Sequence, residues 1–96
     1  MIKVLIKDKN ITISGHANYD EYGKDIVCAA VSATVITTVN GILSIDESSI
    51  EVIENGKVEI RILKESEIVN KLINNMINLL TELQKDYKDN IDIRRC

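Results

Sequence analysis

His16 and Cys28 are the two side chains of this sequence whose chemistry could build an active site. His16 is the only histidine, Cys28 is one of two cysteines, and a polar loop between Gly15 and Gly23 separates them. A thiolate is a strong nucleophile, and a nearby imidazole can serve as its base and later as the acid for the leaving group. The pair therefore predicts acyl transfer through a thiol, provided that the fold brings the two side chains together.

Cys28 follows Asp25 at the spacing expected between a helix N-cap and the first turn of the helix. The positive end of a helix favours a thiolate at this position, and its free N–H groups could also hold a developing oxyanion. Asp25 has a second interpretation, as a third catalytic group that orients His16, although capping is the simpler role. Cys28 is also typical of a buried core cysteine, because Ala29 and Ala30 follow it.

Three further residues are candidates for contact with a substrate. Tyr19 and Tyr22 lie in the polar loop, which is either an ordinary connection or a lid that recognises substrate. Ser32 is one helical turn beyond Cys28, where it either lines the site or bonds back to the helix backbone. One histidine, one cysteine and scattered acids show no spacing of metal ligands, so no metal site is expected.

Apolar periodicity predicts the elements that must position these residues, in the order β-β-α-β-β-α. An α+β domain over residues 1–96, an antiparallel sheet carrying two helices, is the natural solution. We expect residues 91–96 to be a frayed tail. The predicted elements are strands at 1–7 and 11–14, a helix from Ile26 to about Leu43, a hairpin of 50–53 with 58–63 around Asn55-Gly56, and an amphipathic helix capped by Ser66.

Composition narrows the class of protein. The net charge is −3 with no basic cluster, so direct nucleic-acid binding is disfavoured. Two cysteines and no basic, apolar leader favour a reducing cytoplasm. The run from Ile26 to Ile45 has no charge and is long enough to span a membrane, but polar residues interrupt it and favour a buried central helix. Its apolar character on more than one face predicts a homodimer.

A longer motif is more specific than the pair alone. Gly15-His16-Ala17, followed by Gly23-x-Asp25-Ile26-Val27-Cys28-Ala29-Ala30-Val31-Ser32-Ala33, resembles the ribosomal-processing cysteine protease family of Firmicutes and related bacteria. The separation of the histidine and the cysteine, 28 − 16 = 12 positions, is also similar to that family. Outside residues 15–33 the likeness is one of element order only.

The resemblance implies a homodimeric, cytoplasmic endopeptidase with a Cys–His dyad, in which Cys28 is the nucleophile and His16 the base. It places Asp25 at the acidic position of the family and needs no cofactor. The implied substrate is the precursor of large-subunit ribosomal protein twenty-seven, a basic partner that loses an N-terminal extension. The alternatives are a non-catalytic ribosome-assembly or interaction domain, in which Cys28 is a core residue, and a cysteine acyl-hydrolase acting on a small molecule.

Overall fold

The computed structural model describes all 96 residues, which form five strands and two helices. The chain runs through β1 (Ile2–Lys7), β2 (Asn10–Ser14), α1 (Ile26–Ile45), β3 (Ile50–Glu54), β4 (Val58–Ile62), α2 (Glu67–Asp86) and β5 (Ile91–Arg95). The predicted order β-β-α-β-β-α and the α+β class are confirmed over the first six elements. The seventh element, β5, was not predicted.

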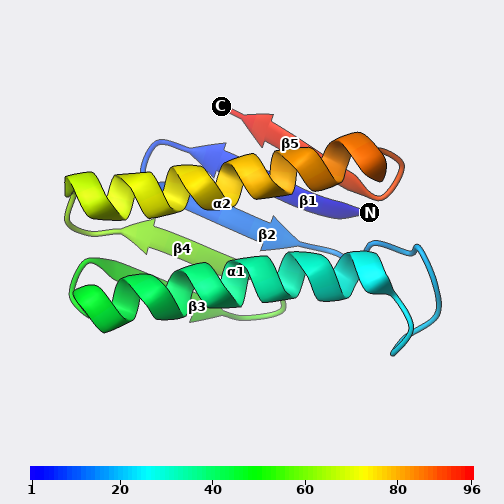
Figure 1. Cartoon of the computed structure of the whole chain (residues 1–96), viewed down its shortest axis with the longest axis horizontal. Coiled ribbons are helices and arrows are strands. Elements are labelled where there is room, and N and C mark those ends of the chain that lie inside the picture. The colour runs from blue at the N-terminus through cyan, green and yellow to red at the C-terminus, as the bar shows by residue number, and fades with distance from the viewer.

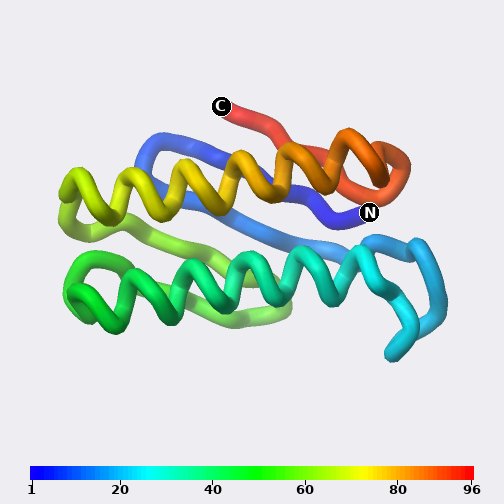
Figure 2. Tube along the Cα trace, viewed as in Figure 1, coloured from blue at the N-terminus to red at the C-terminus, as the bar shows by residue number.

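The strands form one sheet in the order β3-β4-β2-β1-β5. Three neighbouring pairs are antiparallel, and β1 pairs with β5 in parallel, with Val4 opposite Ile93. The expectation of a frayed tail was therefore wrong, and the sheet is mixed rather than purely antiparallel. The physical reason is the burial of Ile91, whose side chain is fully covered, in a strand that contacts α2. The chain trace shows β5 running beside β1 (Figure 2).

Both helices lie on the same face of the sheet and pack against each other (Figure 1). The core between the two layers is aliphatic, as the scarcity of aromatic residues requires. In β1 the side chains alternate strictly, with Ile2, Val4 and Ile6 buried. The predicted hairpin at Asn55-Gly56 is confirmed, because β3 and β4 pair directly across it and Gly56 takes a positive φ of 73°.

α1 is helical as predicted, but it is less buried than expected. One stripe faces the core, made of Val27, Val31, Val35, Val39 and Ile42. The opposite side is open to solvent, with Ile36 57% exposed. The helix also continues past Asn40-Gly41 to Ile45, because packing of Ile42 against the core overrides that local stop signal.

α1 is also the one helix whose length and apolar composition would suit a membrane span. The core helix of a soluble protein meets the same two criteria. Since its Val27–Ile42 stripe is part of the core shared with the sheet, we describe α1 as a core helix.

Candidate active site

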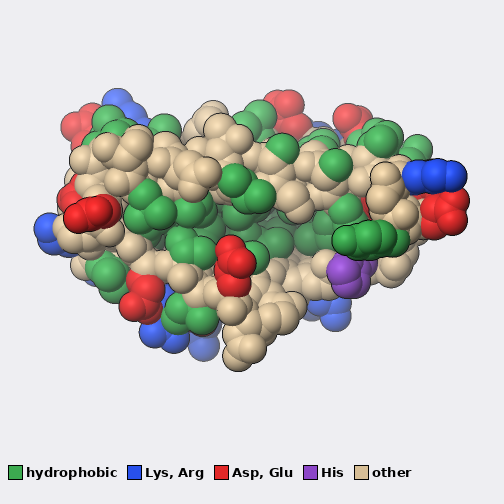
Figure 3. Space-filling view, turned by 90° about the horizontal axis from the view of Figure 1, so that it is seen from below, with side chains coloured by type: hydrophobic (Ala, Val, Ile, Leu, Met, Phe, Trp, Pro, Cys, Tyr) green, Lys and Arg blue, Asp and Glu red, His purple; other side chains and the backbone are tan.

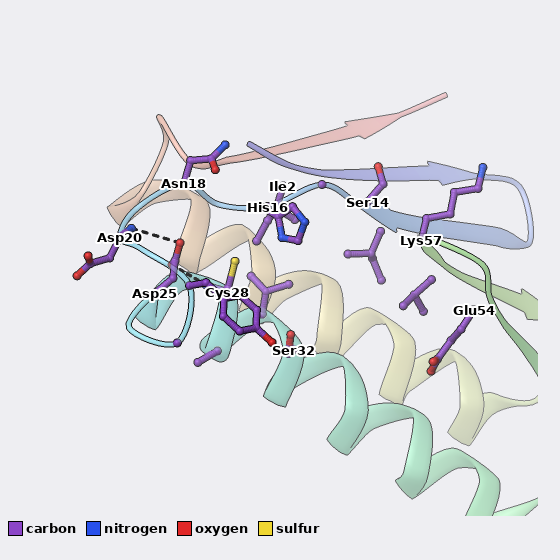
Figure 4. A pocket seen from close by; sticks show the side chains of 18 residues that line it. Ile2, Ser14, His16, Asn18, Asp20, Asp25, Cys28, Ser32, Glu54 and Lys57 are labelled. Carbon is purple, nitrogen blue, oxygen red and sulfur yellow. Dashed lines mark hydrogen bonds between the residues drawn. The ribbon is translucent and has the colours of Figure 1, made fainter.

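A cavity of about 860 Å³ opens at the end of the sheet from which the segment 15–25 leaves. Its walls come from the end of β2, that segment, the first turns of α1 and the tip of the β3–β4 hairpin (Figure 4). From below, the surface shows a hollowed band of hydrophobic side chains with the histidine near one end (Figure 3). Residues that are far apart in sequence thus share one recess.

Cys28 occupies the third position of α1, with its side chain half-buried and its sulfur directed into the cavity (Figure 4). The sulfur accepts a hydrogen bond from the backbone N–H of Ala17 at 3.3 Å. This bond joins the segment after β2 to the first turn of α1. Cys28 therefore packs against the core without being closed off from the cavity.

His16 lies just beyond β2 and is exposed to solvent. Its imidazole points toward the sulfur of Cys28, and both side chains line the cavity (Figure 4). The structure contains no hydrogen bond between them, and the one bond of the sulfur comes from the Ala17 N–H. The fold thus brings the two residues to one site without a direct bond between their side chains.

Asp25 is the N-cap of α1, as predicted, and it also holds the preceding loop. Its Oδ1 accepts from the N–H groups of Val27 and Cys28, each at 3.0 Å. Its Oδ2 accepts from Tyr19 at 3.0 Å and Asp20 at 3.3 Å. Partial desolvation works against ionisation, but the four N–H donors, led by Cys28, outweigh it and hold the pKa of Asp25 below its ordinary value of 3.8.

This capping corrects one expectation about the first turn. The N–H groups of Val27 and Cys28 are not free to hold an oxyanion, because both donate to the Asp25 carboxylate. The other interpretation was that Asp25 orients His16, but no hydrogen bond joins their two side chains. All the hydrogen bonds of the Asp25 carboxylate go to backbone N–H groups.

Two of the three candidate substrate-binding residues line the cavity, and the third does not. Tyr22 is fully exposed and, with Ser32, lines the cavity. Tyr19 does not line it, and its ring instead meets Tyr87 edge to face, with centroids 5.4 Å apart. Ser32 makes no hydrogen bond back to the helix, unlike Thr34, whose hydroxyl bonds to the carbonyl of Ala30.

Several residues near the site were not found from the sequence. Glu54 and Lys57 reach the cavity from the β3–β4 hairpin (Figure 4). In the sequence they are ordinary charged residues beside a turn. Asn90 donates from its side chain to the carbonyl of Ala17 at 2.9 Å, across 73 positions. The alternation of Ile91 and Ile93 was the signal that could have placed this segment in the sheet.

No group of three His, Cys, Asp or Glu side chains in the structure could hold a metal ion. The cavity presents the thiol of Cys28 and the imidazole of His16. An accessible thiol in the first turn of a helix, sharing a cavity with an imidazole, is the arrangement of a cysteine-dependent hydrolase.

Residues 1–92 match the family model described as cysteine protease Prp. A ribosomal processing cysteine protease Prp of Bacillus subtilis (strain 168) is 34% identical, over 97% of this chain and 96% of the relative. Two crystal structures of the essential ribosomal processing protease Prp from S. aureus align over the full length of both chains. The structure with a covalently linked product peptide has a TM-score of 0.95 and 26% sequence identity. The structure with a substrate peptide has a TM-score of 0.87 and 25% sequence identity.

The chain belongs to the Prp family of cysteine proteases. It is accordingly a cysteine protease, and the alternative of a non-catalytic domain with a core cysteine is set aside. The resemblance read from residues 15–33 is confirmed over nearly the whole chain.

Proposed function

We propose that this protease removes the N-terminal extension of large-subunit ribosomal protein twenty-seven, with Cys28 as nucleophile and His16 as general base. The observation that carries the proposal is the convergence of the two side chains on one cavity at the start of α1. The relatives' role in ribosomal processing supports the class of substrate. A product peptide covalently linked to a relative of the same fold supports a covalent intermediate.

The reaction begins when His16 accepts the proton of the Cys28 thiol and the resulting thiolate attacks the carbonyl carbon of the scissile peptide bond. The new C–S bond forms as the carbonyl electron pair moves to oxygen, which gives an oxyanion. As the oxyanion collapses, the C–N bond breaks and the His16 imidazolium gives its proton to the leaving amine. A water molecule, deprotonated by His16, then attacks the thioester, and collapse of the second oxyanion releases the carboxylic acid and the thiolate.

Substrate contacts are proposed along the same cavity. Tyr22 and Ser32 lie at the Cys28 end, and Glu54 lies at the hairpin end. Tyr19 contributes indirectly, because its contact with Tyr87 fixes the loop that carries Tyr22. The carboxylates of Asp20, Asp25 and Glu54 outnumber Lys57 as charges around the cavity, which suits a basic precursor.

The same proposal includes a homodimer that works in the cytoplasm. The solvent side of α1 carries no charge and presents Ile26, Ala29, Ala33, Ile36 and Thr37. An uncharged apolar strip of this kind is costly in water and fits a second copy of the same strip. Sedimentation that gives the mass of a monomer at micromolar concentration would contradict the dimer.

Cleavage of the purified precursor tests the proposal. Wild-type protein is expected to yield a shortened product with a new N-terminus, and Cys28→Ala to lower the rate by about 10⁴-fold or more. His16→Ala is expected to slow cleavage as well, by at least about 10²-fold. Cys96→Ala is the matched control, since it removes the other, exposed cysteine and leaves cleavage unchanged. Processing by a folded Cys28→Ala variant at the wild-type rate would exclude this mechanism.

A further inference from the structure

The backbone N–H of Ala17 is the donor that reaches the sulfur of Cys28, at 3.3 Å. Ala17 is almost fully buried, with 1% of its surface exposed, and it lies between the cavity-lining residues His16 and Asn18. The N–H groups of Val27 and Cys28, which would otherwise face the same region, are taken by Asp25. A carbonyl attacked by the sulfur therefore meets the Ala17 N–H as the donor already directed at the reacting atoms.

The other side of Ala17 is fixed by a residue from the far end of the chain. The side-chain amide of Asn90 donates to the Ala17 carbonyl at 2.9 Å. Asn90 is itself anchored through its backbone, since its N–H donates to the Tyr87 carbonyl at 2.9 Å and its carbonyl accepts from the Ile2 N–H at 2.8 Å. The amide thus connects a well-fixed turn between α2 and β5 to the residue that donates to the sulfur.

The segment around Ala17 is held on both sides in a specific backbone shape. Gly15 and Asn18 both take positive φ values, 84° and 56°. A side chain at Gly15 would collide with the Met1 carbonyl, so only glycine lets the chain pass β1 here. Tyr19 packs on Tyr87, which belongs to the same α2–β5 turn as Asn90. A segment fixed at so many points presents its N–H in one direction.

We propose that the Ala17 N–H is an oxyanion-stabilising donor and that Asn90 is the positioning residue that holds it. The inference rests on the proposed nucleophilic role of Cys28. In the tetrahedral intermediate, the oxyanion and the sulfur are bonded to the same carbon, so a donor directed at the sulfur is also within reach of the oxygen. Donors held in advance at this position stabilise the intermediate without reorganisation in each catalytic cycle.

Two reactions of the same thiol separate this role from a general effect on Cys28. Acylation by p-nitrophenyl acetate passes through an oxyanion, whereas alkylation by iodoacetamide displaces iodide and forms none. Both rates are measured in a Cys96→Ser background, on the plateau at high pH where the thiol is ionised in every variant. Asn90→Ala is expected to lower the acylation rate by about 10-fold and to leave the alkylation rate unchanged.

The controls fix the meaning of each result. Asn78→Ala, on the exposed side of α2, is expected to change neither rate. An equal fall of both rates in Asn90→Ala, or no fall in either, would overturn the proposal. If Asn90→Ala does not fold, a chain made by chemical synthesis with an ester in place of the Ala17 N–H removes the donor alone, and an unchanged acylation rate there overturns it. Neither reaction uses the ribosomal precursor, so failure to cleave that protein is a separate outcome.

Discussion

The two helices have the same length, 20 residues, but they differ in the distribution of charged and apolar side chains. α2 has the amphipathic pattern of a surface helix, with a buried stripe and a solvent face that carries Glu67 and Lys71 as an ion pair at 3.2 Å. α1 has no charged residue at all. α2 is therefore adapted to water on one side, whereas α1 has an uncharged side exposed to solvent.

The helix N-termini differ in the same way. Ser66 caps α2 with a single bond to the N–H of Val69, which is buried. Asp25 caps α1 with bonds to two helical N–H groups and two loop N–H groups. The residue equivalent to Val69 in α1 is Cys28, whose sulfur faces the cavity. The comparison shows that one helix serves packing alone, and the other serves the site as well.

A charge on the exposed side of α1 is expected to change the protein more than any substitution at the helix caps. Ile36→Glu is expected to weaken self-association by about 100-fold, because the residue would occur twice in the proposed symmetric interface. Sedimentation velocity over a range of concentrations measures the effect. Leu79→Glu is the matched control on α2, where the leucine is 45% exposed, against 57% for Ile36. An equal shift in both variants would contradict an interface specific to α1.

Replacing the α1 cap with the α2 cap gives a smaller effect. Asp25→Ser keeps an acceptor for the first turn of α1 and removes the acceptor used by the N–H groups of Tyr19 and Asp20. The loop should loosen while the helix persists, so kcat/KM for the precursor should fall by about 10-fold at little cost in Tm. Steady-state kinetics with thermal unfolding measure the two quantities. Unchanged kinetics would show that Asp25 only caps the helix.

Local signals in the sequence were enough for the first six elements and for the cap. Asp25, Ser66 and Asn55-Gly56 act over a few residues, so their effects can be read without knowing the fold. The motif around His16 and Cys28 likewise predicted one shared site, and the two side chains do line one cavity. Their mutual orientation was not predictable, because it depends on a loop whose shape is set by bonds to Asp25.

Two of the missed features depend on contacts between distant parts of the chain. β5 is a strand because it pairs with β1, and the alternation of Ile91 and Ile93 alone does not identify that partner. The contact of Asn90 with Ala17 follows from that pairing, so it was missed for the same reason. The free N–H groups expected at the start of α1 were lost to Asp25, since a cap satisfies the donors that an uncapped helix would offer.

The smallest predicted effect is a difference between the two helices in their response to acid. The Asp25 carboxylate caps the start of α1, whereas Asp46, at the end of α1, donates its backbone N–H to Ile42 and accepts from Ser48 with its carboxylate. Hydrogen bonds hold the pKa of each carboxyl below its ordinary value of 3.8. For Asp46 the bond from the Ser48 hydroxyl is the main cause. The N-cap of α2 is Ser66, whose side chain carries no carboxyl group. Acid should therefore loosen the start of α1 before that of α2.

The sign of this effect follows from the lowered pKa values. Each carboxylate contributes its full stability above the unfolded pKa, near 3.8, and loses it as the pH falls through the lower folded value. Across this window the unfolded chain binds more protons, so the free energy of unfolding rises with pH. Asp25→Asn should reduce that slope by up to about one proton. Denaturant unfolding followed by circular dichroism measures the slope, and amide NMR of Tyr19 and Val27 reports the bonds themselves. If these amides stay unshifted in acid while the slope is unchanged in Asp25→Asn, the carboxylate is not what ties the loop to α1.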